Sequence, residues 1–183
     1  MIEVEVKAHV TDFKPIRDKL SQIGARTAKF EHQEDLYFNA PHRDFRKTDE
    51  ALRIRKVIRE GRMKIVLTYK GAKLDETSKT RKEIEVVVEE VENMALILES
   101  LGFRLAGTIK KDRTTYNVGE FIVTLDKVYE VGNFVEIEKD LPEGEDFQNS
   151  LNGIFSLYRK LDIEDGFERR SYLELLEQGR NRF

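Results

Sequence analysis

The sequence contains no cysteine, which excludes disulfides and thiolate metal sites. It also lacks any apolar run long enough to cross a membrane as a helix. The N-terminal stretch MIEVEVKAHV carries charge from its third residue and therefore does not resemble a signal peptide. From these absences we expect a cytoplasmic protein with no membrane partner.

An excess of either charge is lacking as well. The chain has 32 Lys and Arg against 35 Asp and Glu, for a formal net charge of -3. Because nucleic-acid-binding proteins are normally clearly basic, we expect no nucleic-acid partner. Charged residues nevertheless make up 37% of the chain, well above the usual share of about a quarter. Abundant but balanced charge leaves room for acidic and basic groups concentrated in one place.

The length of 183 residues fits a single domain over 1–183, built as one unit or from two similar halves. Alternation of apolar and polar residues with period two is the signal of a strand that is buried on one face. It predicts strands at 2–10, 29–39, 51–58, 63–70, 81–89, 107–117, 120–128 and 132–139.

Two amphipathic stretches, 12–23 and 91–101, predict helices. Asp12 is the expected N-cap of the first helix, and Gly24 and Gly102 follow the two helices as expected stop signals.

Two polar connections and the C-terminal region complete the expected chain. Residues 40–50 form the first connection, and 71–80 form a Lys-rich loop. We expect this loop to be solvated, with closure over a ligand as the alternative. Pro142 opens a mainly helical C-terminus, in which Ser171 and Glu174 form a capping box.

The chain repeats itself. Residues 3–6, Glu-Val-Glu-Val, match residues 83–86, Glu-Ile-Glu-Val, and the helix ends at 20–26 and 98–104 are also alike. The two separations are 80 and 78 residues, so the register is kept. We interpret this as two halves, each a strand, a helix and further strands, that form one barrel or two facing sheets. Chance similarity of short segments is the alternative.

Charged side chains occupy one face of nearly every predicted strand. Arg53 and Arg55, for example, oppose Leu52 and Ile54. A plain sheet with its charged face in water would also give this alternation. These faces are almost wholly ionic, however, and the helices need an apolar surface to cover. We therefore predict an α+β fold, in which an antiparallel eight-stranded barrel has a charged lumen and helices packed outside.

The predicted lumen holds opposed acids and bases in nearly equal number. Buried ion pairs contribute little net stability against their desolvation cost, so a ligand that completes the network is a better explanation than a structural lattice alone. The acids are Glu3, Glu5, Glu83, Glu85, Asp126, Glu136 and Glu138, and the bases are Lys7, Arg53, Arg55, Lys64, Lys70, Arg81, Lys111 and Arg113.

Glu3-Val4-Glu5-Val6-Lys7 resembles the ExExK signature of the CYTH superfamily, the triphosphate tunnel metalloenzymes. Further elements follow in that family's order along nearly the whole chain: Leu52-Arg53-Ile54-Arg55, Thr68-Tyr69-Lys70-Gly71, Arg81-Lys82-Glu83-Ile84-Glu85, Lys111-Asp112-Arg113, Asp126 and Glu136-Ile137-Glu138. Within the superfamily, residues 33–38, 48–55 and 170–176 are most similar to the class IV adenylyl cyclase (CyaB-like) group.

The resemblance implies a site. Carboxylates suit Mg²⁺ or Mn²⁺, and zinc is disfavoured because the inward set holds neither His nor Cys. The implied metal ligands are Glu3, Glu5, Asp126, Glu136 and Glu138, with Glu3, Glu5 and Glu136 preferred, while Glu83 and Glu85 orient the bases. The implied substrate-binding residues are Lys7, Arg53, Arg55, Lys64, Lys70, Arg81, Lys111 and Arg113. Catalytic roles fall to Lys111, Arg113, Arg53 and Arg55. We assign no role to His9, His32 and His42.

Three functions fit this site. In a cyclase, the ribose 3′-oxygen of ATP attacks the α-phosphorus and gives cyclic AMP and pyrophosphate; this is the preferred hypothesis. In a triphosphatase, water attacks the terminal phosphorus of tripolyphosphate, thiamine triphosphate or a nucleoside triphosphate. The third alternative is a non-catalytic protein that binds a nucleotide or polyphosphate. The resemblance also implies a homodimer, and the sequence reveals no adenine pocket.

Overall fold

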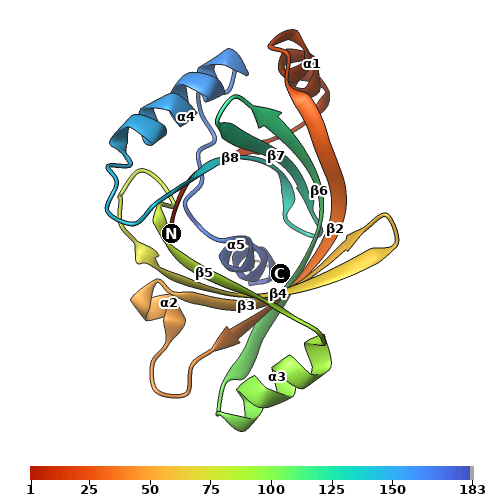
Figure 1. The fold of residues 1–183 in the computed structure, drawn as a ribbon, viewed down its shortest axis with the longest axis vertical. Helices are drawn as coiled ribbons and strands as arrows, with labels where there is room; N and C mark the ends of the chain where they lie inside the picture. Colours follow the sequence, from red (N-terminus) through yellow and green to blue (C-terminus); the bar gives the residue numbers. More distant parts are fainter. Residues whose placement is uncertain (182–183) are drawn as a thin grey trace.

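The computed structural model describes residues 1–181; residues 182 and 183, which the single-domain prediction includes, lie outside this range. Within the described range, eight antiparallel strands close into a barrel in the order β1-β5-β4-β3-β2-β6-β7-β8 (Figure 1). The predicted fold class is thereby confirmed. The strands are β1 (Ile2–Val10), β2 (Arg26–Asn39), β3 (Ala51–Arg59), β4 (Arg62–Lys73), β5 (Arg81–Val88), β6 (Arg104–Val118), β7 (Phe121–Val128) and β8 (Gly132–Leu141).

The two halves of the chain have the same strand connections. In the first half, β2 pairs with β3, β3 with β4, and β4 with β5. In the second half the equivalent strands, four places later along the chain with β1 following β8, pair in the same way: β6 with β7, β7 with β8, and β8 with β1. The remaining pairs, β1–β5 and β2–β6, each join a strand to its own equivalent. This arrangement confirms the predicted duplicated halves.

Helices cover the outer, apolar face of the barrel. The largest core cluster lies between β1 and β8 on one side and α1 (Lys14–Gln22) and α4 (Gln148–Lys160) on the other. A smaller cluster joins β3 to α3 (Val91–Ser100) and to the short α2 (Phe45–Thr48). In the part of the chain that the structure describes, no helix has the length and apolar character needed to span a membrane.

The predicted helix ends are largely correct. Gly24 and Gly102 follow α1 and α3 with φ of +75° and +91°, a backbone conformation that side chains disfavour. The predicted N-cap of α1 is wrong by one residue, since Phe13 occupies that position without a side-chain hydrogen bond. Asp12 still accepts a hydrogen bond from the Lys14 amide at 3.0 Å, because its short side chain reaches two residues ahead.

The last helix, α5 (Tyr172–Arg180), closes one end of the barrel and lies inside the ring of strands in Figure 1. It begins with the predicted capping box of Ser171 and Glu174. Its Tyr172 and Leu176 pack on apolar side chains of the lumen face. Those side chains are Ile109, Val128 and Phe134. The lumen is therefore a cavity with a floor.

Candidate functional site

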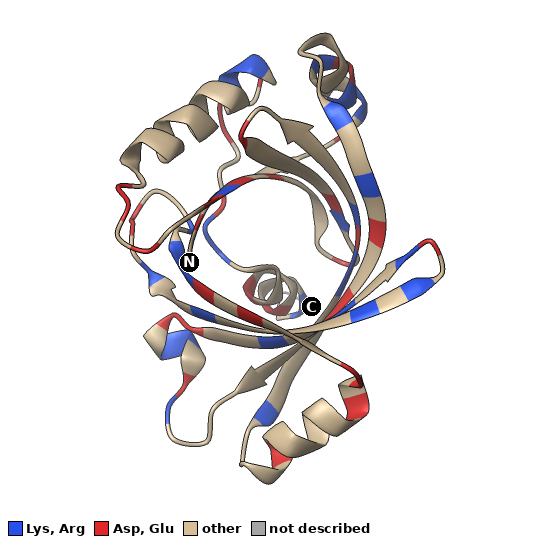
Figure 2. Ribbon diagram, viewed as in Figure 1, with Lys and Arg blue, Asp and Glu red and all other residues tan. Residues whose placement is uncertain are grey.

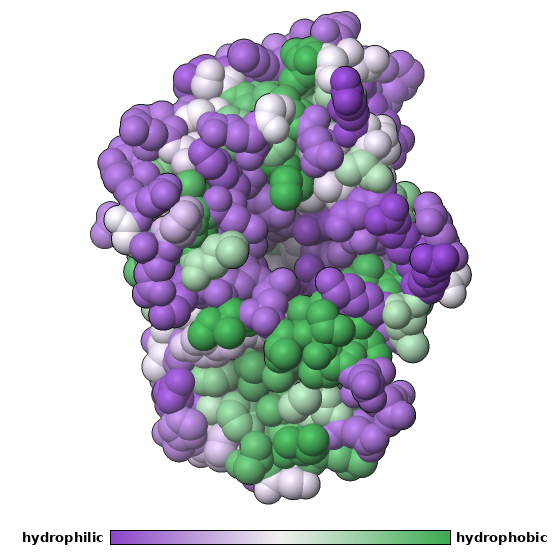
Figure 3. All heavy atoms as spheres, viewed as in Figure 1, coloured by the Kyte–Doolittle hydropathy of each residue, from purple (hydrophilic) through white to green (hydrophobic). Residues whose placement is uncertain are grey.

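The cavity has a volume of about 680 Å³ and is lined by the ionic faces of the strands. Figure 2 shows acidic and basic residues alternating around the ring, and Figure 3 shows a hollow surrounded by hydrophilic atoms. Arg53 and Arg55 line it, whereas Leu52 and Ile54 are buried in the outer core, as predicted. Of the predicted inward residues, all but Lys7 and Asp126 line the cavity.

Asp126 and Lys7 lie deeper, at the floor. Asp126 is fully buried and accepts a hydrogen bond from the Tyr172 hydroxyl at 2.9 Å. The Lys7 ammonium lies 4.2 Å from the Tyr172 ring centre and donates to the Arg170 carbonyl. Burial, reinforced by the charge of Lys79, lowers the pKa of Lys7 to about 7. Asp126 and Lys7 thus both contact Tyr172 of α5, and Lys7 also contacts Arg170, which lies just before that helix.

Arg113 is held by two carboxylates. Strand register places it directly opposite Asp126, and its Nε and Nη2 donate to the two Asp126 oxygens at 2.6 and 2.5 Å. Nη2 also donates to Glu136, and the Lys111 ammonium lies 3.1 Å from Asp126. Burial by itself would raise the pKa of Asp126, but the Arg113 guanidinium and the Lys111 ammonium outweigh it and lower that pKa.

Arg55 is held in the same way. It lies opposite Asp35, and its Nε and Nη2 donate to the two Asp35 oxygens at 2.6 and 2.7 Å. Asp35 is fully buried, and the charge of Arg55 keeps its pKa well below the usual range despite the opposing effect of burial. We call these side chains the paired network; it consists of Asp35, Arg55, Lys111, Arg113, Asp126 and Glu136.

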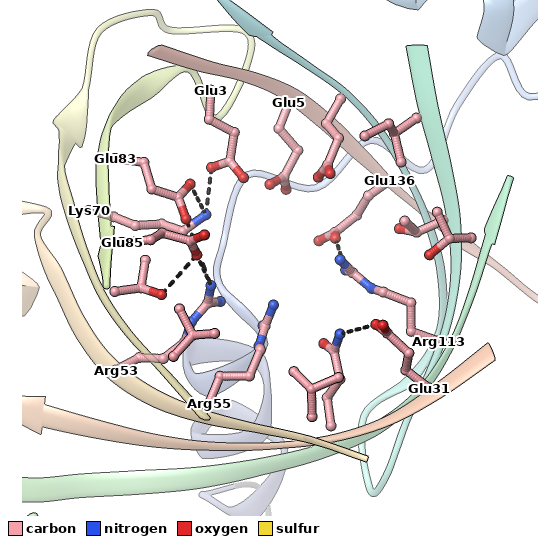
Figure 4. Close-up of a pocket in the computed structure, with 18 of the residues that line it drawn as sticks. Glu3, Glu5, Glu31, Arg53, Arg55, Lys70, Glu83, Glu85, Arg113 and Glu136 are labelled. Carbon is pink, nitrogen blue, oxygen red and sulfur yellow. Dashed lines mark hydrogen bonds and ion pairs between the residues drawn. The ribbon is translucent and has the colours of Figure 1, made fainter. Parts of the chain in front are cut away.

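Arg53 and Arg81 have no such partners. The nearest carboxylates to Arg53, those of Asp35, Glu83 and Glu85, lie at 3.9 Å. Its Nε is buried without a hydrogen-bond partner among the described residues. Arg81 donates only a long hydrogen bond of 3.4 Å, to the Gly71 carbonyl, and forms no ion pair within residues 1–181. Both guanidinium groups border the cavity, and Arg53 points into it in Figure 4.

Two lysines complete the predicted basic set. Lys70 lies between Glu3 at 2.5 Å and Glu83 at 3.0 Å, so Glu83 contacts a member of the predicted basic set. Lys64 is exposed at the rim of the cavity.

Three carboxylates, of Glu3, Glu5 and Glu138, have oxygens within 4.8 Å of one another. The β1–β8 register places Glu138 directly opposite Glu5, whereas Glu136 lies opposite Lys7. Burial, followed by the charge of Glu3, raises the pKa of Glu138 to about 8, while Lys70 and Lys79 contact Glu3 and Glu5. A largely buried cluster of carboxylate oxygens fits a hard divalent cation. We call it the acidic trio.

The trio differs from the preferred ligand set of the sequence prediction in one member. Glu138 joins Glu3 and Glu5, while Glu136 and Asp126 contact Arg113. The metal roles themselves stay predictions.

The prediction that loop 71–80 is solvated is wrong for part of the loop, although Ala72, Leu74, Glu76 and Thr77 are exposed. Strand β4 continues to Lys73, Ser78 and Thr80 are buried, and Lys79 projects into the cavity. The reason is a tertiary contact, a hydrogen bond of 2.8 Å from the Lys79 amide to the Glu5 carbonyl. Periodicity within the loop gives no sign of this contact.

Sequence reasoning also missed inward residues on β2. Glu31, Gln33 and Asp35 alternate with outward residues such as Leu36, so strand parity could have identified them. None of the three histidines lines the cavity within the described part of the chain, and His32 instead contacts Asp112 on the outer face.

A closed antiparallel barrel with an ionic lumen and an acidic cluster is the triphosphate tunnel fold. The chain belongs to the CYTH family, since the CYTH domain matches residues 1–172. The predicted resemblance is thereby confirmed.

Named relatives agree with this assignment. A Methanocaldococcus jannaschii protein named "putative adenylate cyclase" is 40% identical over 96% of this chain and 98% of its own length. Adenylate cyclase CyaB of Aeromonas hydrophila is 28% identical over 96% of this chain and 89% of its own.

Solved structures show the same fold. The PH1819 protein of Pyrococcus horikoshii is 42% identical, with a TM-score of 0.89 over 96% of this chain and 98% of its own. A Hippeastrum protein, described as an adenylyl cyclase candidate with a dominant triphosphatase activity, shares the fold at 21% identity and a TM-score of 0.66. It covers 97% of this chain and 95% of its own.

Proposed function

We propose that this protein is a divalent-metal-dependent enzyme that acts on a triphosphate, and that it converts ATP to cyclic AMP and pyrophosphate. Members of the CYTH family are adenylyl cyclase-like or triphosphatase enzymes. The names of the relatives favour the cyclase reaction. The observation that carries the triphosphate assignment is that Arg53 and Arg81 border the cavity and, among the described residues, have no carboxylate closer than 3.9 Å.

A buried guanidinium whose nearest carboxylates lie beyond hydrogen-bond distance is costly, and a polyphosphate would supply the missing acceptors. Arg53 and Arg81 border the same cavity as the acidic trio and are the proposed primary contacts for phosphate oxygens. Lys70 and Lys64 add positive charge, and Lys111, Arg113 and Arg55 line the same cavity, held in place by their carboxylate partners.

The proposed cation is Mg²⁺ or Mn²⁺, held by Glu3, Glu5 and Glu138. When bound, such an ion neutralises charge on the phosphate oxygens. In phosphoryl and nucleotidyl transfer most of the rate comes from positioning and charge stabilisation, so no nucleophilic side chain is needed. The floor formed by α5 limits access of water from that end.

In the cyclase reaction, the 3′-oxygen forms a bond to the α-phosphorus, the bond to the departing pyrophosphate breaks, and the 3′-hydroxyl proton is lost to solvent. The nucleoside must then lie outside the ionic part of the cavity. Val57 and Val66, on neighbouring strands, line the cavity and offer an apolar surface to the base.

Hydrolysis of inorganic tripolyphosphate is the second candidate function. It is favoured by the ionic character of the lining, because tripolyphosphate requires charge and no base pocket. The dominant triphosphatase activity described for the Hippeastrum protein adds support.

The test is product identification. The protein is incubated with ATP, tripolyphosphate or thiamine triphosphate and Mg²⁺ or Mn²⁺, with an EDTA control and an Arg53→Ala control. We expect cyclic AMP and pyrophosphate from ATP. Orthophosphate release without cyclic AMP would assign the triphosphatase reaction instead. Binding without any product would refute the enzymatic proposal and indicate a sensor.

A further inference from the structure

Lys79 reaches the cavity from a segment that is not part of any strand. We call residues 74–80, between β4 and β5, the strap. Lys79 is the second-to-last residue of the strap, and its side chain is only 13% exposed.

The strap backbone is fixed at several points. The Lys79 amide donates to the Glu5 carbonyl and the Leu74 amide to the Thr80 carbonyl, both at 2.8 Å. From outside the barrel, Arg169 donates to the Asp75 carbonyl at 2.8 Å. The strap therefore holds the Lys79 Cα in place, and the flexible part is the four-carbon side chain.

The Lys79 ammonium lies against the acidic trio. It donates to Glu5 at 2.5 Å and lies 3.8 Å from Glu136, which Arg113 already contacts. Glu3, in contrast, is contacted by Lys70. Lys79 thus occupies an oxygen of the same Glu5 carboxylate that a cation in the trio would use.

A divalent cation and a lysine ammonium that share one carboxylate repel each other strongly in a buried site. When the cation binds, the Lys79 ammonium has to leave Glu5, although its backbone stays fixed. The open space within its reach is the cavity, where a triphosphate would lie.

We propose that Lys79 is a positioning residue that neutralises Glu5 while the metal is absent and turns to the phosphates once the metal is bound. This inference rests on the proposed function. On this proposal, Lys79 has two opposite effects on affinity. Its side chain weakens metal binding to the free protein, and it strengthens triphosphate binding to the metal-loaded protein.

The test uses Lys79→Met, which removes the charge at similar length, and Lys79→Gln as a second neutral variant. Lys79→Arg keeps the charge. The matched control is Lys82→Met, because Lys82 lies three residues away on the outer surface, is half exposed, and within the described part of the chain pairs only with Glu143. Mn²⁺ affinity is measured by electron paramagnetic resonance without triphosphate. Affinity for a tripolyphosphate analogue with P–NH–P bridges, which resists hydrolysis, is then measured by calorimetry with Mn²⁺ in excess.

We expect both neutral variants to bind Mn²⁺ about tenfold more tightly than the wild type, and to bind the analogue about tenfold more weakly. Lys79→Arg and Lys82→Met should stay close to the wild type in Mn²⁺ affinity. Unchanged or weaker Mn²⁺ binding by the neutral variants, with normal wild-type binding, would overturn the role of Lys79 alone. A wild-type protein that binds neither Mn²⁺ nor the analogue would overturn the proposed function together with this inference.

Discussion

Arg113 and Arg53 lie in the same cavity but differ in what surrounds them. Arg113 donates to Asp126 at 2.6 and 2.5 Å and also to Glu136. Arg53 has its nearest carboxylates at 3.9 Å, and its buried Nε lacks a partner among the described residues. One guanidinium is satisfied by the protein, and the other is not.

The acids show the same contrast. Charges of neighbouring bases lower the pKa of Asp126, whereas burial and neighbouring acids raise the pKa of Glu138 to about 8. The paired network is therefore close to internal balance. Among the described residues, Glu138 of the acidic trio forms no ion pair, and Arg53 and Arg81 have donors without a close acceptor. This difference separates side chains that hold the barrel together from those available to a cation and a triphosphate.

The largest expected effect concerns the acidic trio. Glu5→Gln removes one negative charge with almost no change in volume, and we expect kcat/KM to fall about 10³-fold or more, because a metal ion supplies several kcal/mol of charge stabilisation. The melting temperature should stay near that of the wild type. Steady-state kinetics beside a thermal melt measure both. Wild-type activity in this variant would refute the metal assignment.

The next prediction compares how much unfolding free energy is lost when Arg113 or Arg53 is replaced by alanine. Arg113→Ala leaves Asp126 and Glu136 buried without their partner, which should cost about 3–5 kcal/mol of unfolding free energy. Arg53→Ala removes a base whose ion pairs are longer, at 3.9 Å, and should cost clearly less than Arg113→Ala. Urea denaturation of both variants provides the comparison. If the two lose the same stability, the division into tightly and loosely paired bases fails.

Much of this cavity was predictable because strand parity is a local property. Alternation at Arg53 and Arg55 was sufficient to place these side chains inside the barrel. The choice of partners was not predictable in this way, since it depends on register between distant strands. Glu138 joins the trio because β1 and β8 place it opposite Glu5, and no periodicity distinguishes it from Glu136.

Tertiary contacts account for the other differences. The strap is ordered by the Glu5 carbonyl and by Arg169, both far from it in sequence. The floor depends on where α5 lies, although its capping box was visible in the sequence. The position of such a loop or helix depends on contacts with residues far away in the sequence, and the spacing of its own residues does not reveal those contacts.

Acid sensitivity tests the paired network at Asp35. Its folded-state pKa lies below the ordinary value of about 3.9, so its stabilising effect is complete above that value and is lost as the pH falls through the folded-state pKa. Asp35→Asn should lose about 2–3 kcal/mol at neutral pH and show a flatter decline in acid. The control is Asp18→Asn, which breaks an exposed pair with Lys14 and should cost less than about 0.5 kcal/mol. Urea denaturation from pH 7 down to about pH 2, well below the ordinary pKa of aspartate, measures both; an unchanged acid profile for Asp35→Asn would contradict the assignment.

The smallest expected effect is at the rim. Lys64 is exposed, so Lys64→Ala should raise KM about two- to fivefold at low salt, leave kcat unchanged, and lose its effect at high salt. Kinetics at two ionic strengths measure this. A large fall in kcat would mean that Lys64 contacts the reacting phosphates.

The central claim is that Arg53 and Arg81, which lack acceptors at hydrogen-bond distance for most of their donors, bind a triphosphate. Calorimetric titration of the wild type and Arg53→Ala with the hydrolysis-resistant tripolyphosphate analogue, in the presence of Mg²⁺, tests it most directly. We predict that Arg53→Ala binds the analogue at least about tenfold more weakly, because a charge-assisted contact to phosphate is lost, while its melting temperature stays within a few degrees of the wild type. Equal affinity in the two proteins would contradict the claim.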